Sequence, residues 1–384
     1  MSQTITAGSP LSALNPVSSR IFNYSAGPGV LPEEVIEQAQ HDLWNVHGSG
    51  MGIMEHSHRA KVYDKILQEA LEDCRTIGQV PKGYQIMFMT GGATSQNFLV
   101  PANLLRQDQS ADYLTTGYWA ERSFEDAQMY GHIHEAWDGR KHKHNFVPSD
   151  QEINYSNKPV YVHMCSNNTI YGTQWRHNDG SLRIPKIPSD SFLVCDMCSD
   201  IYSRPLDISK FGVIYAGAQK NVGIAGVSVV IIRDDLLALK PRELPLMLQY
   251  RVMAKEESRH NTPPVFPIYM SGLVFKWILK QGGLAAIHKR NLEKAKIVYD
   301  VLDTSEYYTG HARKDSRSLM NITFRTPNEE LDNKFVAEAL ANGMDNLKGH
   351  RATGGMRASV YNAMPREGSE RLAQFMKEFE RKNG

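Results

Sequence analysis

Two residues of the sequence, a lysine and an aspartate, have the types and the spacing that one cofactor requires. Lys220 follows the apolar run Val213–Ala216 after a short turn, and Asp196 closes the neighbouring apolar run Phe192–Cys195. Short apolar runs of this kind predict buried strands. Pyridoxal 5'-phosphate (PLP) is bound as a Schiff base to a lysine, and a carboxylate pairs with its protonated ring nitrogen. We therefore predict a PLP site in which Lys220 and Asp196 are the catalytic residues.

Each of the two residues also has an ordinary explanation. Most lysines lie on the protein surface, and an aspartate after a strand often caps the next turn. Lys220, however, stands among Gly, Ala and Gln between two strands and not on a charged helical face. We expect desolvation beside a cationic ring to help its amine lose a proton, and we expect Asp196 to keep the ring nitrogen protonated.

Two further segments follow predicted strands and open predicted helices. In Thr90–Ser95 the glycines let the backbone approach a phosphate, and amide groups at a helix N-terminus favour an anion. An ordinary glycine turn with a Ser/Thr cap explains this segment equally well. Trp119, two residues after Gly117, is placed to stack on a pyridine ring, although an isolated tryptophan more often belongs to a core.

Two clusters of basic residues beside glycines suggest anion binding. One follows a glycine-rich stretch at 48–52, and the other surrounds Gly354-Gly355. Their candidate ligand-binding members are His58, Arg59, His350, Arg351 and Arg357. Arginine binds carboxylate or phosphate through a planar fork, and histidine adds a donor. Solvated charges on loops are the alternative for either cluster alone. Together the clusters suit a substrate that carries a carboxylate and either a phosphate or a second carboxylate.

The rest of the chain alternates short apolar runs with amphipathic segments. Several runs are apolar throughout, as expected for strands that helices cover on both faces. The predicted strands are Tyr84–Met89, Asp112–Thr115, His132–Ala136, Val160–Met164, Phe192–Cys195, Val213–Ala216 and Val227–Ile232, and the helical patterns include Pro32–Trp44, Val62–Ile77 and Ser95–Leu105. This alternation predicts an α/β fold with a large, mostly parallel sheet between helices. Ligands of such sheets gather at the carboxyl ends of the strands, where Asp196 falls.

We expect three parts along the chain. A flexible N-terminal arm spans 1–20, and a large PLP-binding domain spans 21–284, with first residues that can pack on the small domain. A smaller α+β C-terminal domain spans 285–384. The arm lacks the basic and apolar regions of a signal peptide. The small domain is predicted from a helix after Gly282-Gly283, strand-like segments at 319–324 and 355–361, a helix near 332–342 and a last amphipathic helix.

The composition excludes several classes of function. The 43 Lys and Arg residues nearly balance the 42 Asp and Glu residues, which argues against a nucleic-acid-binding or polybasic membrane surface. No apolar stretch is long enough to span a bilayer. The spacing of Cys195 and Cys198 would suit a redox or zinc site only with a second ligand pair, so we expect reduced thiols and no metal. We therefore expect a cytoplasmic protein with no nucleic-acid or membrane partner.

From about Asn23 to its C-terminus, the chain resembles the phosphoserine aminotransferases, which are PLP enzymes with the aspartate aminotransferase-like fold. The resemblance rests on short motifs that are weak alone and specific together. They are Asn23–Pro28, His58-Arg59, Gly117–Trp119, Tyr215–Asn221 and His350–Ser359. The chain departs from the family pattern at Asn168, Cys198 and Ile224, all of which lie in loops around the predicted site.

The resemblance implies a role for each candidate residue. The PLP ring would be held by Lys220, Asp196, Trp119 and Thr169. The cofactor phosphate would be bound by Ala93, Thr94 and Gln219, together with Asn261 and Thr262 of the neighbouring subunit. The substrate α-carboxylate would be bound by Arg357, and its distal anion by His58, Arg59, His350 and Arg351, partly across a subunit interface. The implied assembly is a homodimer with active sites at that interface.

The resemblance also implies an activity. It is the reversible transfer of an amino group from L-glutamate to 3-phosphohydroxypyruvate, which gives 2-oxoglutarate and O-phospho-L-serine in serine biosynthesis. A second phosphorylated substrate, 3-hydroxy-2-oxo-4-phosphonooxybutanoate of pyridoxine biosynthesis, is implied as well.

Three alternative functions fit the sequence less well. A cysteine desulfurase-like lyase needs a reactive cysteine late in the chain, and no cysteine follows Cys198. A non-catalytic binding protein of the same fold would not need Lys220, Asp196 and Arg357. A nicotinamide-binding protein needs G-x-G-x-x-G after its first strand, which Gly91–Thr94 does not supply.

Overall fold

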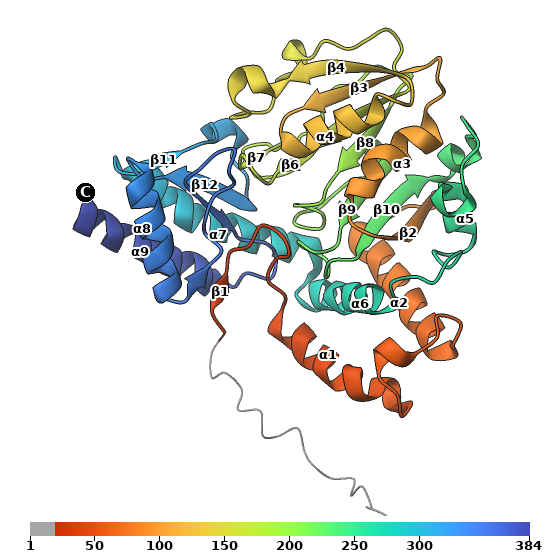
Figure 1. Ribbon diagram of the computed structural model, residues 1–384, viewed down its shortest axis with the longest axis horizontal. Helices are drawn as coiled ribbons and strands as arrows, with labels where there is room; N and C mark the ends of the chain where they lie inside the picture. The colour runs from red at the N-terminus through yellow and green to blue at the C-terminus, as the bar shows by residue number, and fades with distance from the viewer. Residues whose placement is uncertain (1–19) are drawn as a thin grey trace, which may run out of the picture.

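The largest element of the fold is a seven-stranded mixed sheet (Figure 1). A computed structural model describes residues 20–384, so the expected arm lies outside the described residues apart from Arg20. The strands, in their order across the sheet, are β2 (Tyr84–Thr90), β10 (Val227–Arg233), β9 (Val213–Gly217), β8 (Phe192–Asp196), β5 (Tyr161–Cys165), β3 (Ser110–Thr115) and β4 (His132–Asp138). Only β10 runs antiparallel to its neighbours. The seven predicted strands and the mostly parallel sheet are confirmed.

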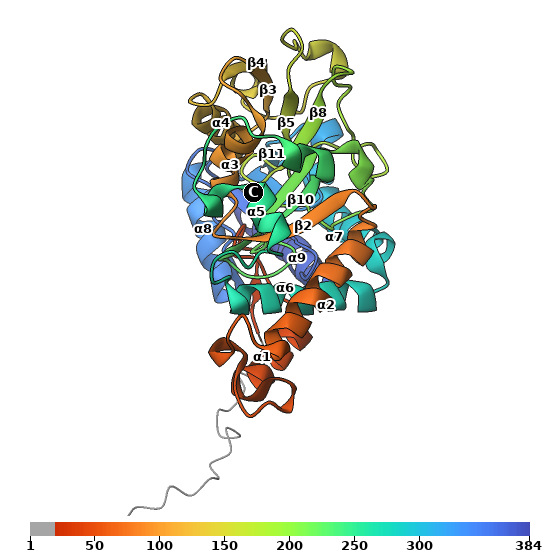
Figure 2. The same cartoon turned by 90° about the vertical axis from the view of Figure 1, so that its right-hand side faces the viewer.

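Alternate residues of the strands face two separate hydrophobic cores. On one face, Ile86 and Phe88 of β2 belong to a core that includes residues of two helices, α2 (Lys61–Gly78) and α6 (Val265–Lys280). On the other face, Met87 and Met89 belong to a core built with α3 (Thr94–Leu104), α4 (Tyr118–Ala127) and α5 (Tyr250–Lys255). Because helices cover both faces, several strands, including β8 and β9, are apolar over most of their length, as the sequence predicted. Figure 2 shows α3 and α4 on the side of the sheet opposite α2 and α6.

The C-terminal part of the chain forms a third core beside the sheet (Figure 1). Its elements are α7 (Gly283–Thr304), β11 (Thr309–Gly310), β12 (Asn321–Arg325), α8 (Glu329–Ala341), β13 (Met344–Asp345), β14 (Met356–Ser359) and α9 (Arg366–Asn383). The predicted break before α7 is present, because Gly282 adopts a left-handed conformation with φ 94°. Tyr24 belongs to this core, and β1 (Phe22–Asn23) pairs with β13. The division of the chain at 284 stays a prediction.

The remaining α-helix of the described chain is α1 (Glu33–Asn45). The two-residue strands β6 (Asn167–Asn168) and β7 (Thr173–Gln174) pair with each other, and short 3-10 helices lie in several connections. Among residues 20–384, no helix combines the length and the apolar character needed to cross a membrane. All four cysteines are free thiols.

Candidate active site

A cavity lies at the edge of the sheet where β5, β8 and β9 end, which is the edge expected to gather ligands. Its wall comes from these strand ends, from the turn between β2 and α3, and from the first turn of α4. The lining residues are Gly92, Ala93, Thr94, Asn97, Trp119, Cys165, Asn167, Thr169, Asp196, Cys198, Ser199, Gln219 and Lys220. The structure therefore brings together both predicted catalytic residues and five more of the predicted cofactor-binding residues.

Asp196, the last residue of β8, places a buried carboxylate in this wall, with 7% of the residue exposed. Its Oδ1 accepts a hydrogen bond from the backbone N–H of Cys198 at 2.8 Å. Burial raises the pKa of Asp196, and the contacts with Cys198 and the charge of Lys220 offset only part of this effect. A buried carboxylate of this kind is stabilised by a cation placed next to it. A protonated ring nitrogen would supply that cation.

Lys220, three residues after the end of β9, lines the same cavity. Its Nζ donates a hydrogen bond to Oγ1 of Thr169 at 2.8 Å. Burial lowers the pKa of Lys220, but Tyr361, Cys198 and Asp196 together outweigh burial, so the pKa is raised overall. The protein groups therefore favour the protonated amine. The sequence led us to expect an amine that loses its proton readily. Because the protein groups do not lower the pKa of Lys220, a cationic ring beside the amine has to do so.

The segment before α1 packs directly on Lys220. The backbone N–H of Gly29 donates to the carbonyl oxygen of Gln219 at 2.7 Å. A Cβ on Gly29 would lie 2.8 Å from the carbonyl oxygen of Lys220, and a Cβ on Gly27 would lie 3.4 Å from its Cε. Gly27 also has a φ of 152°, which residues with side chains rarely adopt. The glycines here thus let the N-terminal segment cross close to Lys220.

The turn between β2 and α3 forms the corner predicted to bind the cofactor phosphate. No side chain caps the start of α3 at Thr94. The N–H groups of Ser95 and Gln96 donate to the carbonyl oxygens of Gly92 and Ala93, which leaves the N–H of Thr94 available to an anion in the described chain. A Cβ on Gly92 would meet no atom within 4 Å, which shows open space above this turn. In the part of the chain that the structure describes, Oε1 of Gln219 is buried without a hydrogen-bond partner. This corner therefore offers unused polar groups beside an open volume.

The second basic cluster lies near the mouth of the cavity. The ring of Tyr118, next to Trp119, lies 5.9 Å from the ring of His350. Burial lowers the pKa of His350, and the nearby Arg357 and Arg351 lower it further. Three cationic or titratable groups are thus gathered next to the wall that carries Trp119.

Arg357 is the most enclosed arginine of this cluster. It lies on β14 and is half-buried. Burial lowers the pKa of Arg357, which Tyr361 partly opposes. Over residues 20–384, no carboxylate forms an ion pair with Arg357 or Arg351. A bound carboxylate or phosphate would supply the missing negative charge.

Besides His350, Arg351 and Arg357, four predicted site residues do not line the cavity in the single chain. His58 is half-buried and Arg59 is exposed, and both lie just before α2. Asn261, whose Nδ2 donates to Oγ1 of Thr90 at 3.3 Å, lies near the end of β2, and Thr262 next to it is exposed. The roles of these residues stay predictions that depend on a second subunit.

Several lining residues were not singled out from the sequence, among them Asn97, Cys165, Asn167 and Ser199. Cys165 and Asn167 come at the end of a predicted strand, so the same rule that selected Asp196 could have found them. Asn168, one of the departures from the family pattern, is buried and donates to Oγ1 of Thr173 at 3.0 Å. The side chain of Asn168 is therefore fixed by a hydrogen bond within its own part of the chain.

A buried ion pair holds the loop after β8 that carries Ser199. Nη2 of Arg204 donates to Oδ2 of Asp200 at 2.7 Å, and the side chains are 5% and 2% exposed, respectively. Nε2 of Gln174 donates to the same carboxylate oxygen at 3.1 Å, and Ser166 donates to the other oxygen. Burial lowers the pKa of Arg204, while Asp200 acts to raise it. The loop is thus fixed by a charge pair that is protected from water.

We expect Asp200→Asn to lower the free energy of unfolding by about 3 kcal/mol, because it leaves the charge of Arg204 buried without a counterion. Urea unfolding of both proteins at the same protein concentration measures the difference. The exposed Asp190, changed to asparagine, is the control and should unfold with the wild type. Equal unfolding midpoints for Asp200→Asn and the control would contradict this account of the loop.

The residues of the cavity fit PLP. A lysine amine and a buried carboxylate share the cavity with an indole ring, and one corner offers open space and unused polar groups. These are the groups needed for covalent attachment, for pairing with the ring nitrogen, for contact with the ring face and for binding a phosphate. The unpaired arginines near the mouth add a place for an anionic substrate.

Known proteins resemble this chain over almost its whole length. The family model Aminotransferase class-V matches residues 21–372. The phosphoserine aminotransferase of Lysinibacillus sphaericus (strain C3-41) is 47% identical over 368 residues, which cover 96% of this chain and 100% of that protein. The solved phosphoserine aminotransferase from Bacillus circulans subsp. alkalophilus has a TM-score of 0.91 and 44% identity, covering 95% of this chain and 99% of the other. A PLP-bound phosphoserine aminotransferase from Trichomonas vaginalis has a TM-score of 0.88 and 36% identity, covering 93% of this chain and 100% of the other.

Proposed function

The chain belongs to the phosphoserine aminotransferases of the class-V aminotransferase family, and we propose that it transfers an amino group reversibly from L-glutamate to 3-phosphohydroxypyruvate. The products are 2-oxoglutarate and O-phospho-L-serine, in a step of serine biosynthesis in the cytoplasm. The observation that carries this proposal is a single cavity that holds Lys220 and Asp196, with unpaired arginines near its mouth. A role in pyridoxine biosynthesis, with 3-hydroxy-2-oxo-4-phosphonooxybutanoate, rests on the resemblance alone.

PLP is the proposed cofactor, and the PLP-bound relative supports it. When bound, PLP supplies a ring that withdraws electrons from the substrate Cα. Lys220 would attach the cofactor, and its amine would move the proton at the substrate Cα as general base and acid. The carboxylate of Asp196 holds the ring nitrogen in its charged form. Trp119 would contact the ring, and Thr169 accepts a hydrogen bond from the lysine amine.

The substrate is held by its two anionic ends. Arg357 binds the α-carboxylate, because its half-buried guanidinium has no ion-pair partner in the described chain. His350 and Arg351 bind the distal anion, together with His58 and Arg59 of the partner subunit. A distal carboxylate and a phosphate present similar oxygen faces to the same arginines and histidines. One site therefore accepts glutamate and the phosphorylated acid in turn.

The experiment that tests this function uses one substrate alone. We expect O-phospho-L-serine, added without any keto acid, to remove the visible absorption band of the bound cofactor, because the amino group passes to it. Absorption spectroscopy of the PLP-loaded protein measures this change. A band that O-phospho-L-serine leaves unchanged would contradict the proposed substrate but not the proposed cofactor. A protein that shows no band even after PLP is added would contradict both.

The proposed homodimer gives a second prediction, because each site would combine Lys220 of one subunit with Arg59 of the other. We expect Lys220→Ala and Arg59→Ala, each nearly inactive alone, to regain activity when their subunits are exchanged. One site of each mixed dimer is then fully wild type, so random exchange restores up to about a quarter of wild-type activity. Steady-state transamination after mild dissociation and reassembly measures the recovery. Mixed dimers that form without recovery would show that Arg59 acts in its own subunit.

A further inference from the structure

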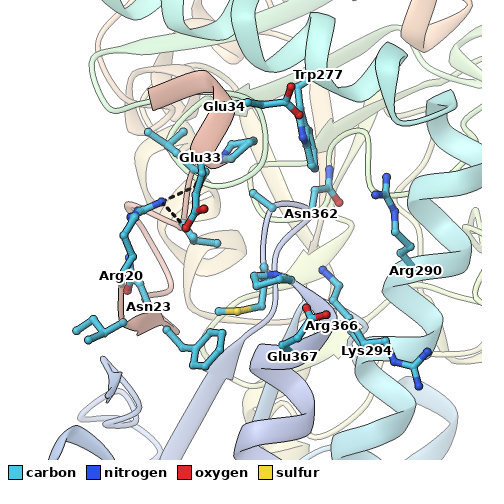
Figure 3. A pocket seen from close by; sticks show the side chains of 18 of the residues that line it. Arg20, Asn23, Glu33, Glu34, Trp277, Arg290, Lys294, Asn362, Arg366 and Glu367 are labelled. Atoms are coloured by element: carbon cyan, nitrogen blue, oxygen red, sulfur yellow. Dashed lines mark hydrogen bonds and ion pairs between the residues drawn. The ribbon is translucent and has the colours of Figure 1, made fainter. Parts of the chain in front are cut away.

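A second cavity, of about 580 Å³, lies where the N-terminal segment, α6, α7 and the start of α9 meet (Figure 3). Trp277 of α6 and Arg290 and Lys294 of α7 approach it from one side, and Arg20 and Glu33 lie on the opposite side. Its volume is in the range of small-molecule sites. It shares no lining residue with the cavity of Lys220 and lies outside the proposed active site.

Half of the charged groups around this cavity already have partners. Arg20 lies 3.9 Å from Glu33, and Nε of Arg366 donates to Oε1 of Glu370 at 2.8 Å. The carboxylate of Glu34 pairs with Lys280. The charges of these lining residues are therefore already paired.

The two cations of α7 have no such partner. Nη1 of Arg290 donates to Oε1 of Gln281 at 2.5 Å, but its Nη2 is buried and forms no hydrogen bond within residues 20–384. Nζ of Lys294, a residue that is 2% exposed, donates to the carbonyl oxygens of Val360 and Tyr361, which leaves one of the three donors of its protonated form unused. No carboxylate of the described chain forms an ion pair with either cation. Burial, followed by the charge of Arg290, lowers the pKa of Lys294 to about 7.

Residues 1–19 of the sequence contain no Asp or Glu, so they bring no carboxylate side chain that could pair with these cations. Two carboxylates that line the same cavity, Glu293 of α7 and Glu367 of α9, are also without an ion pair in the described residues. Unpaired charges of both signs thus face one volume. Apolar side chains, including Trp277 and Met364, line the same cavity.

We propose that this cavity binds a free α-amino acid with an apolar side chain. Its carboxylate pairs with the charges of Arg290 and of protonated Lys294, and it accepts a hydrogen bond from the donor of Lys294 that the protein leaves unused. Its ammonium group is held by Glu293 and Glu367. Its side chain packs against Trp277 and Met364, which removes apolar surface from water.

Titration calorimetry of the PLP-loaded protein with L-leucine tests the proposal. We expect saturable binding, and we expect Arg290→Met and Glu293→Gln each to weaken it at least about tenfold, since each removes one charge-assisted contact. Arg381→Met, which changes an exposed arginine at the end of α9, should leave the affinity unchanged. 4-Methylpentanoate lacks the ammonium group and 3-methylbutylamine lacks the carboxylate, so both should bind much more weakly than L-leucine.

The visible absorption of the bound cofactor separates this cavity from the active site. L-Leucine that fills the second cavity should leave the band unchanged at concentrations where calorimetry shows saturation. A band that changes over the same concentration range, with heat that survives Arg290→Met, would place the amino acid beside Lys220 and overturn the proposal. The absence of saturable heat, or equal binding of the two singly charged analogues, would overturn it as well.

Discussion

We expect Lys220→Ala to abolish transamination, with kcat lowered by at least about 10³-fold, because one group both attaches the cofactor and moves the proton. Lys220 is the one lysine that lines the cavity within the described residues, so no neighbouring amine can replace it. Steady-state kinetics with L-glutamate and 3-phosphohydroxypyruvate measure the loss. The visible band of covalently attached PLP should be absent from the variant as well.

The matched control for this substitution is Lys210→Ala, which changes an exposed lysine in the same half of the chain. It should keep wild-type kcat and the visible band. The two variants should also unfold at similar urea concentrations, since Lys220 forms only one side-chain hydrogen bond in the described chain. Substantial turnover by Lys220→Ala beside a normal control would show that another residue performs the proton transfer.

The sheet and the centre of the site could be predicted because both are encoded locally. Strands that are buried on both faces must be apolar throughout, and this made β8 and β9 visible as short runs of the sequence. Asp196 then followed from a general rule, because the carboxyl ends of parallel strands meet at one edge of a sheet. Lys220 followed from its place after the next strand. The other lining residues at strand ends, such as Cys165 and Asn167, could have been predicted by applying the same rule to every strand.

The rest of the site depends on contacts between distant segments, which no local pattern encodes. The approach of His350 to Tyr118 is set by how the C-terminal core packs beside the sheet. Tyr361 acts on the pKa of both Lys220 and Arg357, yet nothing in its own neighbourhood of the sequence marks it. Arg59 is exposed on the single chain, and its predicted role depends on an interface that one chain does not contain.

The second large effect is expected at Asp196, where Asp196→Asn should lower kcat by about 10²–10³-fold, the usual cost of removing one preorganised electrostatic contact. The substitution keeps the shape of the side chain and an oxygen that accepts the hydrogen bond from the N–H of Cys198. It removes only the negative charge that keeps the ring nitrogen protonated. Because Lys220 is intact, PLP should still attach, so the variant keeps a visible band while turnover falls. Asp190→Asn, on the surface, is the control.

The pH dependence of cofactor affinity gives this prediction a readout other than turnover. Burial raises the pKa of Asp196, so in the free protein this carboxyl takes up a proton at a higher pH than an ordinary aspartate does. Only the ionised form attracts a protonated ring nitrogen, and the wild-type affinity for PLP should therefore weaken as the pH falls through that pKa. Asparagine does not titrate, so this component of the pH dependence should be missing from Asp196→Asn. Two proteins with the same affinity profile and the same kcat would show that the charge of Asp196 does not act on the cofactor.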